Sequence, residues 1–180
     1  IEQVEIGGNV YPVALWKGQI LNGIIAIDTE TSEIRRGEIP RLFSFQAFDG
    51  ESGFFVPFGL ITEFFRVHKD SAFIFCNAAF DLSVLQGTVF VHDNVYKLVD
   101  TEQVVDISIV YRLLELAITG KVPKQYSLKK LAKEYFDIDL DKEVRDSFLG
   151  PETDLTEQTM TEEQQIYAIK DAVITWLIFD

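Results

Sequence analysis

The chain has 180 residues and a formal charge of −13, from 16 Lys plus Arg against 29 Asp plus Glu. Hydrophobic residues make up 47%, which suits one packed domain and argues against disorder. The single cysteine excludes an internal disulfide and a cysteine-based zinc site. No apolar run approaches the length of about 18 residues that a membrane span needs, so we expect an intracellular protein without a membrane partner. Taken alone, the negative charge also argues against nucleic acid as a partner.

The sequence predicts one domain over residues 1–180, because it contains no low-complexity segment, repeat or Gly/Ser linker. It begins at Ile1 without Met and stops at Asp180 in an apolar, helix-like stretch. We therefore expect a domain excised from a longer polypeptide.

Short apolar runs bounded by turn residues predict the strands of the sheet. They lie at residues 23–27, 41–48, 53–57 and 71–76 and at the start of the segment 104–117, with a hairpin turn at Asp49-Gly50. Helices are expected over residues 61–69 and 78–86, in the rest of 104–117, and from Ser127 onwards.

The last helix has the clearest signal. Thr161 and Gln164 fit a capping box, and apolar residues then follow at helical spacing from Ile166 to Leu177. Strands and helices alternate after the hairpin, which predicts a mixed α/β sheet with helices on both faces.

The first candidate site residues stand at the end of the strand over residues 23–27. Asp28 and Glu30 are two positions apart, so their side chains leave the strand on the same face. Carboxylates that converge at the edge of an apolar sheet repel each other and lose hydration unless a cation lies between them. Such oxygen ligands suit Mg²⁺ or Mn²⁺.

A second group follows the strand over residues 71–76, where Asn77 directly precedes a helix. Taken alone, Asn77 is most simply an N-cap and Asp81 a surface acid one turn later. Because four residues separate them, both side chains could instead point over the same sheet edge as Asp28.

The third group is Tyr167 and Asp171, one turn apart on the last helix and beside its apolar stripe. A core-facing Asp needs a partner or a metal. The alternative is that Tyr167 packs as an aromatic side chain and Asp171 pairs with a neighbouring lysine.

In this order the three groups resemble the DEDDy class of 3′–5′ exonucleases, which includes ribonuclease D, the Werner-syndrome exonuclease and the proofreading domain of bacterial DNA polymerase I. The resemblance runs from about Gly23 to the C-terminus. It includes Asp106, which opens a helix after a strand, and the segments Tyr126–Tyr135 and Leu140–Lys142. It implies a ribonuclease H-like fold, a mixed five-stranded sheet with helices on both faces.

The resemblance also implies a role for individual residues. Two divalent ions, Mg²⁺ or Mn²⁺, would be held by four carboxylates: Asp28, Glu30, Asp81 and Asp171. Tyr167 would orient the attacking water, since a phenol with a pKa of about 10 is a poor base at neutral pH. The substrate would be contacted by Thr29, Asn77, Phe80 and Lys142. For Phe80, packing in the core is the simpler role.

The implied reaction is hydrolysis of the terminal 3′ phosphodiester, with release of nucleoside 5′-monophosphates. Two ions about 4 Å apart can clamp the attacking and leaving oxygens of such a displacement. Asp28 would contact both ions, Glu30 and Asp171 would complete the one that activates water, and Asp81 would hold the other.

Three functions stay open. The single-stranded 3′ end of DNA is the expected partner, in proofreading or end processing, with a polymerase domain of the same parent chain supplying most of the grip. Trimming of RNA 3′ ends, as in ribonuclease D, is the first alternative, favoured by Lys142. The second is a catalytically silent nucleic-acid-binding domain. The joint presence of four acids and Tyr167 argues against it.

The basic residues between Lys121 and Arg145 form either a face that contacts the nucleic-acid backbone or a solvated surface.

Overall fold

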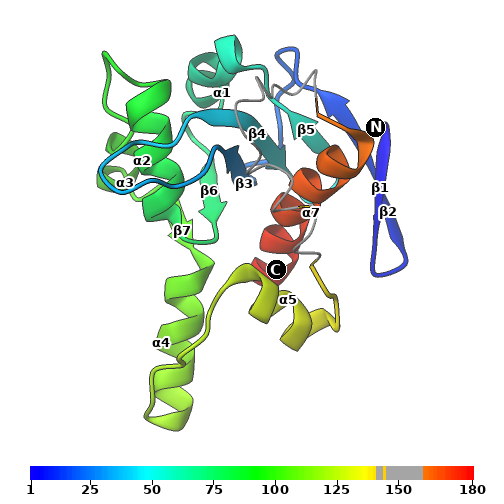
Figure 1. The fold of residues 1–180 in the computed structure, drawn as a ribbon, viewed down its shortest axis with the longest axis vertical. Helices are drawn as coiled ribbons and strands as arrows, with labels where there is room; N and C mark the ends of the chain where they lie inside the picture. Colours follow the sequence, from blue (N-terminus) through cyan, green and yellow to red (C-terminus); the bar gives the residue numbers. More distant parts are fainter. Residues whose placement is uncertain (141–143, 145–159) are drawn as a thin grey trace.

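The computed structural model describes residues 1–140, 144 and 160–180. Their centre is a seven-stranded mixed sheet with the strand order β1-β2-β5-β4-β3-β6-β7 (Figure 1). The strands are β1 (Gln3–Ile6), β2 (Asn9–Leu15), β3 (Ile24–Thr31), β4 (Leu42–Phe48), β5 (Gly53–Phe55), β6 (Ala72–Phe75) and β7 (Val104–Asp106).

The five predicted strands are β3 to β7. The sequence did not predict the two additional strands, β1 and β2, which form a hairpin. This hairpin turns at Gly7 and Gly8, which both have positive φ. A Gly-Gly pair between strands is a hairpin signal that the prediction overlooked. β2 pairs with β1 as far as Pro12 and then continues in parallel beside β5, so proline, which lacks an N–H group, lies where the pairing changes.

The directions of the strands bring the expected site residues to one edge. β4 runs antiparallel to both β3 and β5, which confirms the predicted hairpin. β3, β6 and β7 run parallel to one another. Because the carboxyl ends of parallel strands meet at one edge, the residues that end β3 and β7 lie beside Asn77, which follows β6.

The helices lie where the sequence predicts them, apart from a short additional helix, α3. They are α1 (Ile61–Val67), preceded by the single 3₁₀ turn η1 (Phe58–Leu60), α2 (Ala78–Thr88), α3 (Lys97–Asp100), α4 (Ile107–Thr119), α5 (Leu128–Phe136) and α7 (Glu162–Phe179). None of the helices in the described part of the chain has the length and apolar character needed to cross a membrane.

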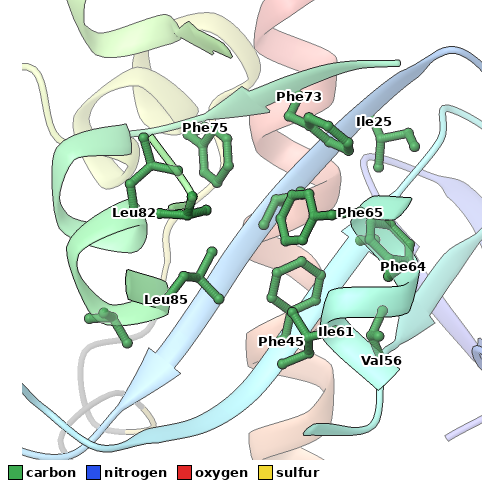
Figure 2. Close-up of a cluster of buried hydrophobic side chains, with 14 of the residues drawn as sticks. Ile25, Phe45, Val56, Ile61, Phe64, Phe65, Phe73, Phe75, Leu82 and Leu85 are labelled. Carbon is green, nitrogen blue, oxygen red and sulfur yellow. The ribbon is translucent and has the colours of Figure 1, made fainter. Parts of the chain in front are cut away.

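One face of the sheet is covered by α1 and α2, and its core is rich in phenylalanine. Figure 2 shows Phe65 of α1 beside Phe73 of β6, and Leu82 of α2 beside Phe75. The rings of Phe65 and Phe73 meet edge to face, with centroids 5.0 Å apart. Such pairs add to the stabilisation from burial alone.

The other face is covered by α7, which carries two of the expected site residues. The capping box predicted at its start is present, because Thr161 and Gln164 exchange side-chain and backbone hydrogen bonds. Ile169 and Val173 are fully buried and belong to the same cluster as Phe48 of β4. This packing fixes the helix against the sheet along most of its length.

Two glycines of the β4–β5 hairpin let α7 approach closely. A Cβ at Gly50 would lie 2.6 Å from a ring carbon of Trp176, and one at Gly53 would lie 2.8 Å from Ile169. Gly50 also has a φ of +95°, which side chains disfavour. The hairpin turn and the helix that carries the site are therefore matched in shape.

α4 differs from the other helices, since it extends away from the sheet (Figure 1). Its buried residues are Ile107, Ser108 and Tyr111. Leu113 and Ile118 are 60% and 77% exposed, and further apolar side chains on this helix are exposed as well. An exposed apolar patch of this kind is typical of a surface that contacts another protein or domain.

Replacing Gly50 should show how much of the domain's stability depends on the close approach of α7 to the β4–β5 hairpin. We expect Gly50→Ala to destabilise the domain by about 2–4 kcal/mol, from backbone strain plus the clash with Trp176. Gly37→Ala is the matched control, because Gly37 also has positive φ but open space around it, so only strain of about 1 kcal/mol should appear. Urea unfolding measures both, and equal losses would contradict the clash.

Buried His68 should make stability depend on pH. Its Nε2 accepts from the N–H of Leu21 (3.0 Å) and its Nδ1 donates to the carbonyl oxygen of Phe64 (2.8 Å), which requires the neutral ring. Burial lowers the pKa of His68. The unfolded chain therefore binds a proton more readily, so this stabilisation is complete above about pH 6.5 and is lost as pH falls through the lower folded value.

Urea unfolding at several pH values between about 5 and 8 measures this dependence. It should be weaker in His68→Gln and unchanged in His92→Gln, which alters the exposed histidine. An equal pH dependence in His68→Gln and the wild type would contradict the assignment.

Candidate active site

Three carboxylates meet beneath α7. Asp28 and Glu30 are half-buried on β3, and Asp171 is 9% exposed on α7. Each can offer an oxygen so that all three ligand atoms lie within 4.8 Å of one another. The structure thus brings together two of the three predicted groups, with residues more than 140 positions apart in the sequence.

Asp81 reaches the same strand from the opposite face. It lies in the first turn of α2, is 5% exposed and accepts a hydrogen bond of 2.7 Å from the Thr29 hydroxyl. Burial, and then the charge of Asp28, raise the pKa of Asp81 well above its usual value. Asp81 is outside the three-carboxylate group, although the charge of Asp28 adds to the effect of burial on its pKa.

Thr29, which the resemblance implied as a substrate contact, directs its side chain away from Asp28 and Glu30. Its side chain alternates with those of Asp28 and Glu30 and therefore faces α2. The hydroxyl is buried and is directed to Asp81. Its place in the structure is that of a residue that orients a carboxylate.

The backbone at the start of α2 is capped by Asp106, which also opens α4 as the sequence predicts. Asn77 is the N-cap, but its side chain makes no capping hydrogen bond and is exposed. Instead, Asp106 accepts from the backbone N–H groups of Asn77 (3.1 Å) and Ala78 (2.9 Å). The same carboxylate caps α4 through the N–H (2.9 Å) and hydroxyl (2.7 Å) of Ser108.

Asn77 has a φ of 73°, in the left-handed region that asparagine tolerates better than most residues. Its exposed side chain is thus held at the sheet edge where Asp28 and Asp106 lie. Cys76 precedes it, and burial followed by the charges of Asp106 and Asp28 raises the pKa of its thiol. A cysteine with a raised pKa is a poor nucleophile.

The remaining predicted site residues lie in different surroundings. Tyr167 is half-buried, one turn before Asp171 on the same helix. Phe80 is half-buried and packs against the core beneath α1 and α2, which favours its packing role. Lys142 lies outside the described residues.

The donor set fits a divalent cation. Closely spaced carboxylate oxygens are ligands that Mg²⁺ and Mn²⁺ prefer, and a cation would offset their mutual repulsion. Asp28, Glu30 and Asp171 could hold such an ion together.

A family model described as a 3′–5′ exonuclease matches residues 15–180. The chain therefore belongs to this family of 3′–5′ exonucleases, as the resemblance implied. No curated protein matches the chain.

Solved structures of exonucleases share the fold. The Aedes aegypti Nibbler EXO domain has a TM-score of 0.69 at 16% identity, over 88% of this chain and 77% of that one. Escherichia coli RNase D, an exoribonuclease involved in structured RNA processing, has a TM-score of 0.63 at 22% identity, over 88% of this chain and 38% of its own. Brucella melitensis NrnC with bound Mg²⁺ has a TM-score of 0.60 at 18% identity, over 88% of this chain and 70% of its own. These likenesses confirm the ribonuclease H-like fold.

Removing the Thr29 hydroxyl should impair the site more than the fold. Thr29→Val keeps the side-chain shape but leaves the Asp81 carboxyl without this donor. We expect exonuclease kcat to fall about tenfold and stability to fall by about 1 kcal/mol. Thr31→Val is the control, because the Thr31 hydroxyl donates to the neighbouring carbonyl oxygen of Ser32 and has no other hydrogen bond among the described residues. Full activity in Thr29→Val would contradict this role.

Proposed function

We propose that this domain is a metal-dependent exonuclease that removes nucleoside 5′-monophosphates from the single-stranded 3′ end of DNA, in proofreading or end processing. The observation that carries the proposal is the convergence of Asp28, Glu30 and Asp171 at the end of one strand, with Asp81 approaching from its other face.

The arrangement of the acids supports two ions. Asp28, Glu30 and Asp171 form one set of ligand atoms. Asp81 lies outside that set, and the charge of Asp28 raises its pKa, so a second cation between Asp28 and Asp81 would remove an unfavourable interaction. Asp28 is then the residue shared by both positions. When bound, the two ions would acidify the attacking water and stabilise charge on the attacking and leaving oxygens.

The other residues hold the reactants in place. Tyr167 lies one turn from Asp171 on a rigidly packed helix, so its hydroxyl can orient the attacking water. Asn77 offers an exposed amide at the same edge and can bind the terminal nucleotide. Neither residue needs to transfer a proton in these roles.

The lysines of α5 support a weak grip on longer nucleic acid. Lys130 pairs with Glu134 at 3.0 Å, and Lys133 pairs with Asp137 at 2.7 Å and Asp139 at 2.8 Å. Lys129 donates to the carbonyl oxygen of Leu140. These contacts support the solvated-surface interpretation of this basic stretch, and they favour a site that holds only the last nucleotides of a strand.

A polymerase domain in the same parent chain stays a prediction. This chain spans only 38% of the length of the E. coli RNase D chain that it resembles. The exposed apolar side of α4, which includes Leu113 and Ile118, is the surface that such a neighbour would cover.

RNA is the alternative substrate, favoured by the likeness to E. coli RNase D. Degradation of 5′-labelled DNA and RNA strands of one sequence, with Mg²⁺ or Mn²⁺ and with EDTA, separates the two. Faster removal of deoxynucleotides supports the proposal. Faster removal of ribonucleotides would mean that the substrate of the exonuclease is RNA. Metal-dependent binding of either strand without cleavage would identify the silent alternative.

Asp28→Asn should abolish activity without unfolding the domain. Losing one carboxylate from both ion positions should lower kcat/KM by at least about a hundredfold, since metal ions supply several kcal/mol of transition-state stabilisation. Asp100→Asn, which changes an exposed acid, is the matched control. Thermal unfolding confirms that both variants are folded, and unchanged cleavage by Asp28→Asn would overturn the site assignment.

A further inference from the structure

A buried polar pair lies on β4 beside the carboxylates, and the site described so far does not use it. Ser44 and Gln46 are 3% and 0% exposed. In the antiparallel register Gln46 lies opposite Asp28, and Ser44 lies opposite Glu30. Side chains that are directly opposite leave the sheet on the same face, so all four face α7.

The two side chains bond to each other. The Gln46 amide nitrogen donates to the hydroxyl oxygen of Ser44. Ser44 lies two residues earlier on the same face, so this bond draws the amide along β4, next to Asp28 and Glu30. The other end of the amide, Gln46 Oε1, is buried and has no hydrogen-bond partner among the described residues.

A buried carbonyl oxygen without a donor costs about 1–3 kcal/mol, and an apolar side chain of similar size would avoid that cost. Carboxylates that are ionised, as metal ligands are, cannot satisfy it, because they only accept hydrogen bonds. A divalent cation would bring the missing donor with it, since the water molecules in its coordination shell are strong donors.

We propose that Gln46 is a positioning residue of the metal site. With an ion held by Asp28, Glu30 and Asp171, Gln46 Oε1 accepts a hydrogen bond from a water ligand of that ion, and Ser44 fixes the orientation of the amide. The consequence for catalysis rests on the proposed function, whereas the consequence for metal binding does not.

Gln46→Met tests this with metal binding as the primary measurement. The variant keeps the length of the side chain and removes the acceptor. In EDTA it should melt within a few degrees of the wild type. Its dissociation constant for Mn²⁺, measured by calorimetry without nucleic acid, should rise about tenfold. The increase in melting temperature on adding Mn²⁺ should shrink accordingly. In the nuclease assay kcat should fall while KM for the oligonucleotide stays unchanged.

Three variants separate positioning from packing. Gln46→Glu keeps an acceptor oxygen and should retain wild-type or tighter Mn²⁺ binding. Ser44→Ala releases the amide and should weaken Mn²⁺ binding less than Gln46→Met does. Phe45→Leu changes the neighbouring residue on the opposite face and should lower stability without changing Mn²⁺ affinity.

Wild-type Mn²⁺ affinity in Gln46→Met, measured on protein with a native circular dichroism spectrum, would overturn the proposal. Gln46→Leu provides the same test if Gln46→Met does not fold. If Mn²⁺ binding weakens as expected while the wild type degrades neither DNA nor RNA, the proposed function fails and the role of Gln46 in metal binding stands.

Discussion

The carboxylates at the end of β3 repel one another, and the packing of the domain has to hold them together. Asp28, Glu30 and Asp171 offer oxygens within 4.8 Å of one another, and the charge of Asp28 contributes to the raised pKa of Asp81. Without a cation these groups favour separation. What opposes separation is the packing of α7, through residues such as Val173. The stability of the core therefore holds these carboxylates together despite their repulsion, and a cation would complete the site.

The alternation of β3 divides the site between the two faces of the sheet. Asp28 and Glu30 face α7, whereas Thr29 between them faces α2 and bonds to Asp81. A register slip of one residue would exchange these sets and disperse the site. The pairing with β4 reinforces the register, because it sets polar Gln46 opposite Asp28 and apolar Phe48 opposite Ala26. The same strand pairing thus specifies both the fold and the place where the proposed cation would be held.

Signals that span a few residues made the secondary-structure elements and the candidate acids predictable. Contacts between residues far apart in the sequence were not predictable. The capping box at Thr161 and the turn at Gly50 each lie within a few residues, so the sequence displays them. The Thr29 bond to Asp81 spans 52 positions, and the Asp106 bond to Asn77 spans 29, so neither can be inferred from a local pattern. The hairpin turn at Gly7-Gly8 is the exception to this division, because its signal is local and yet the strands beside it were not predicted.

The negative charge of the chain bears on where nucleic acid is held rather than on whether it is bound. Four of the 29 acids are the proposed ligands of the site, where divalent cations would offset them. Two lysines on α5 do not offer unpaired positive charge, since Lys130 and Lys133 form ion pairs with acids of the same segment. Lys130 and Lys133 are therefore less available to phosphates beyond the strand end. If the site acts on a 3′ end as proposed, contacts to the rest of the strand would come from basic residues elsewhere on this chain or from another domain.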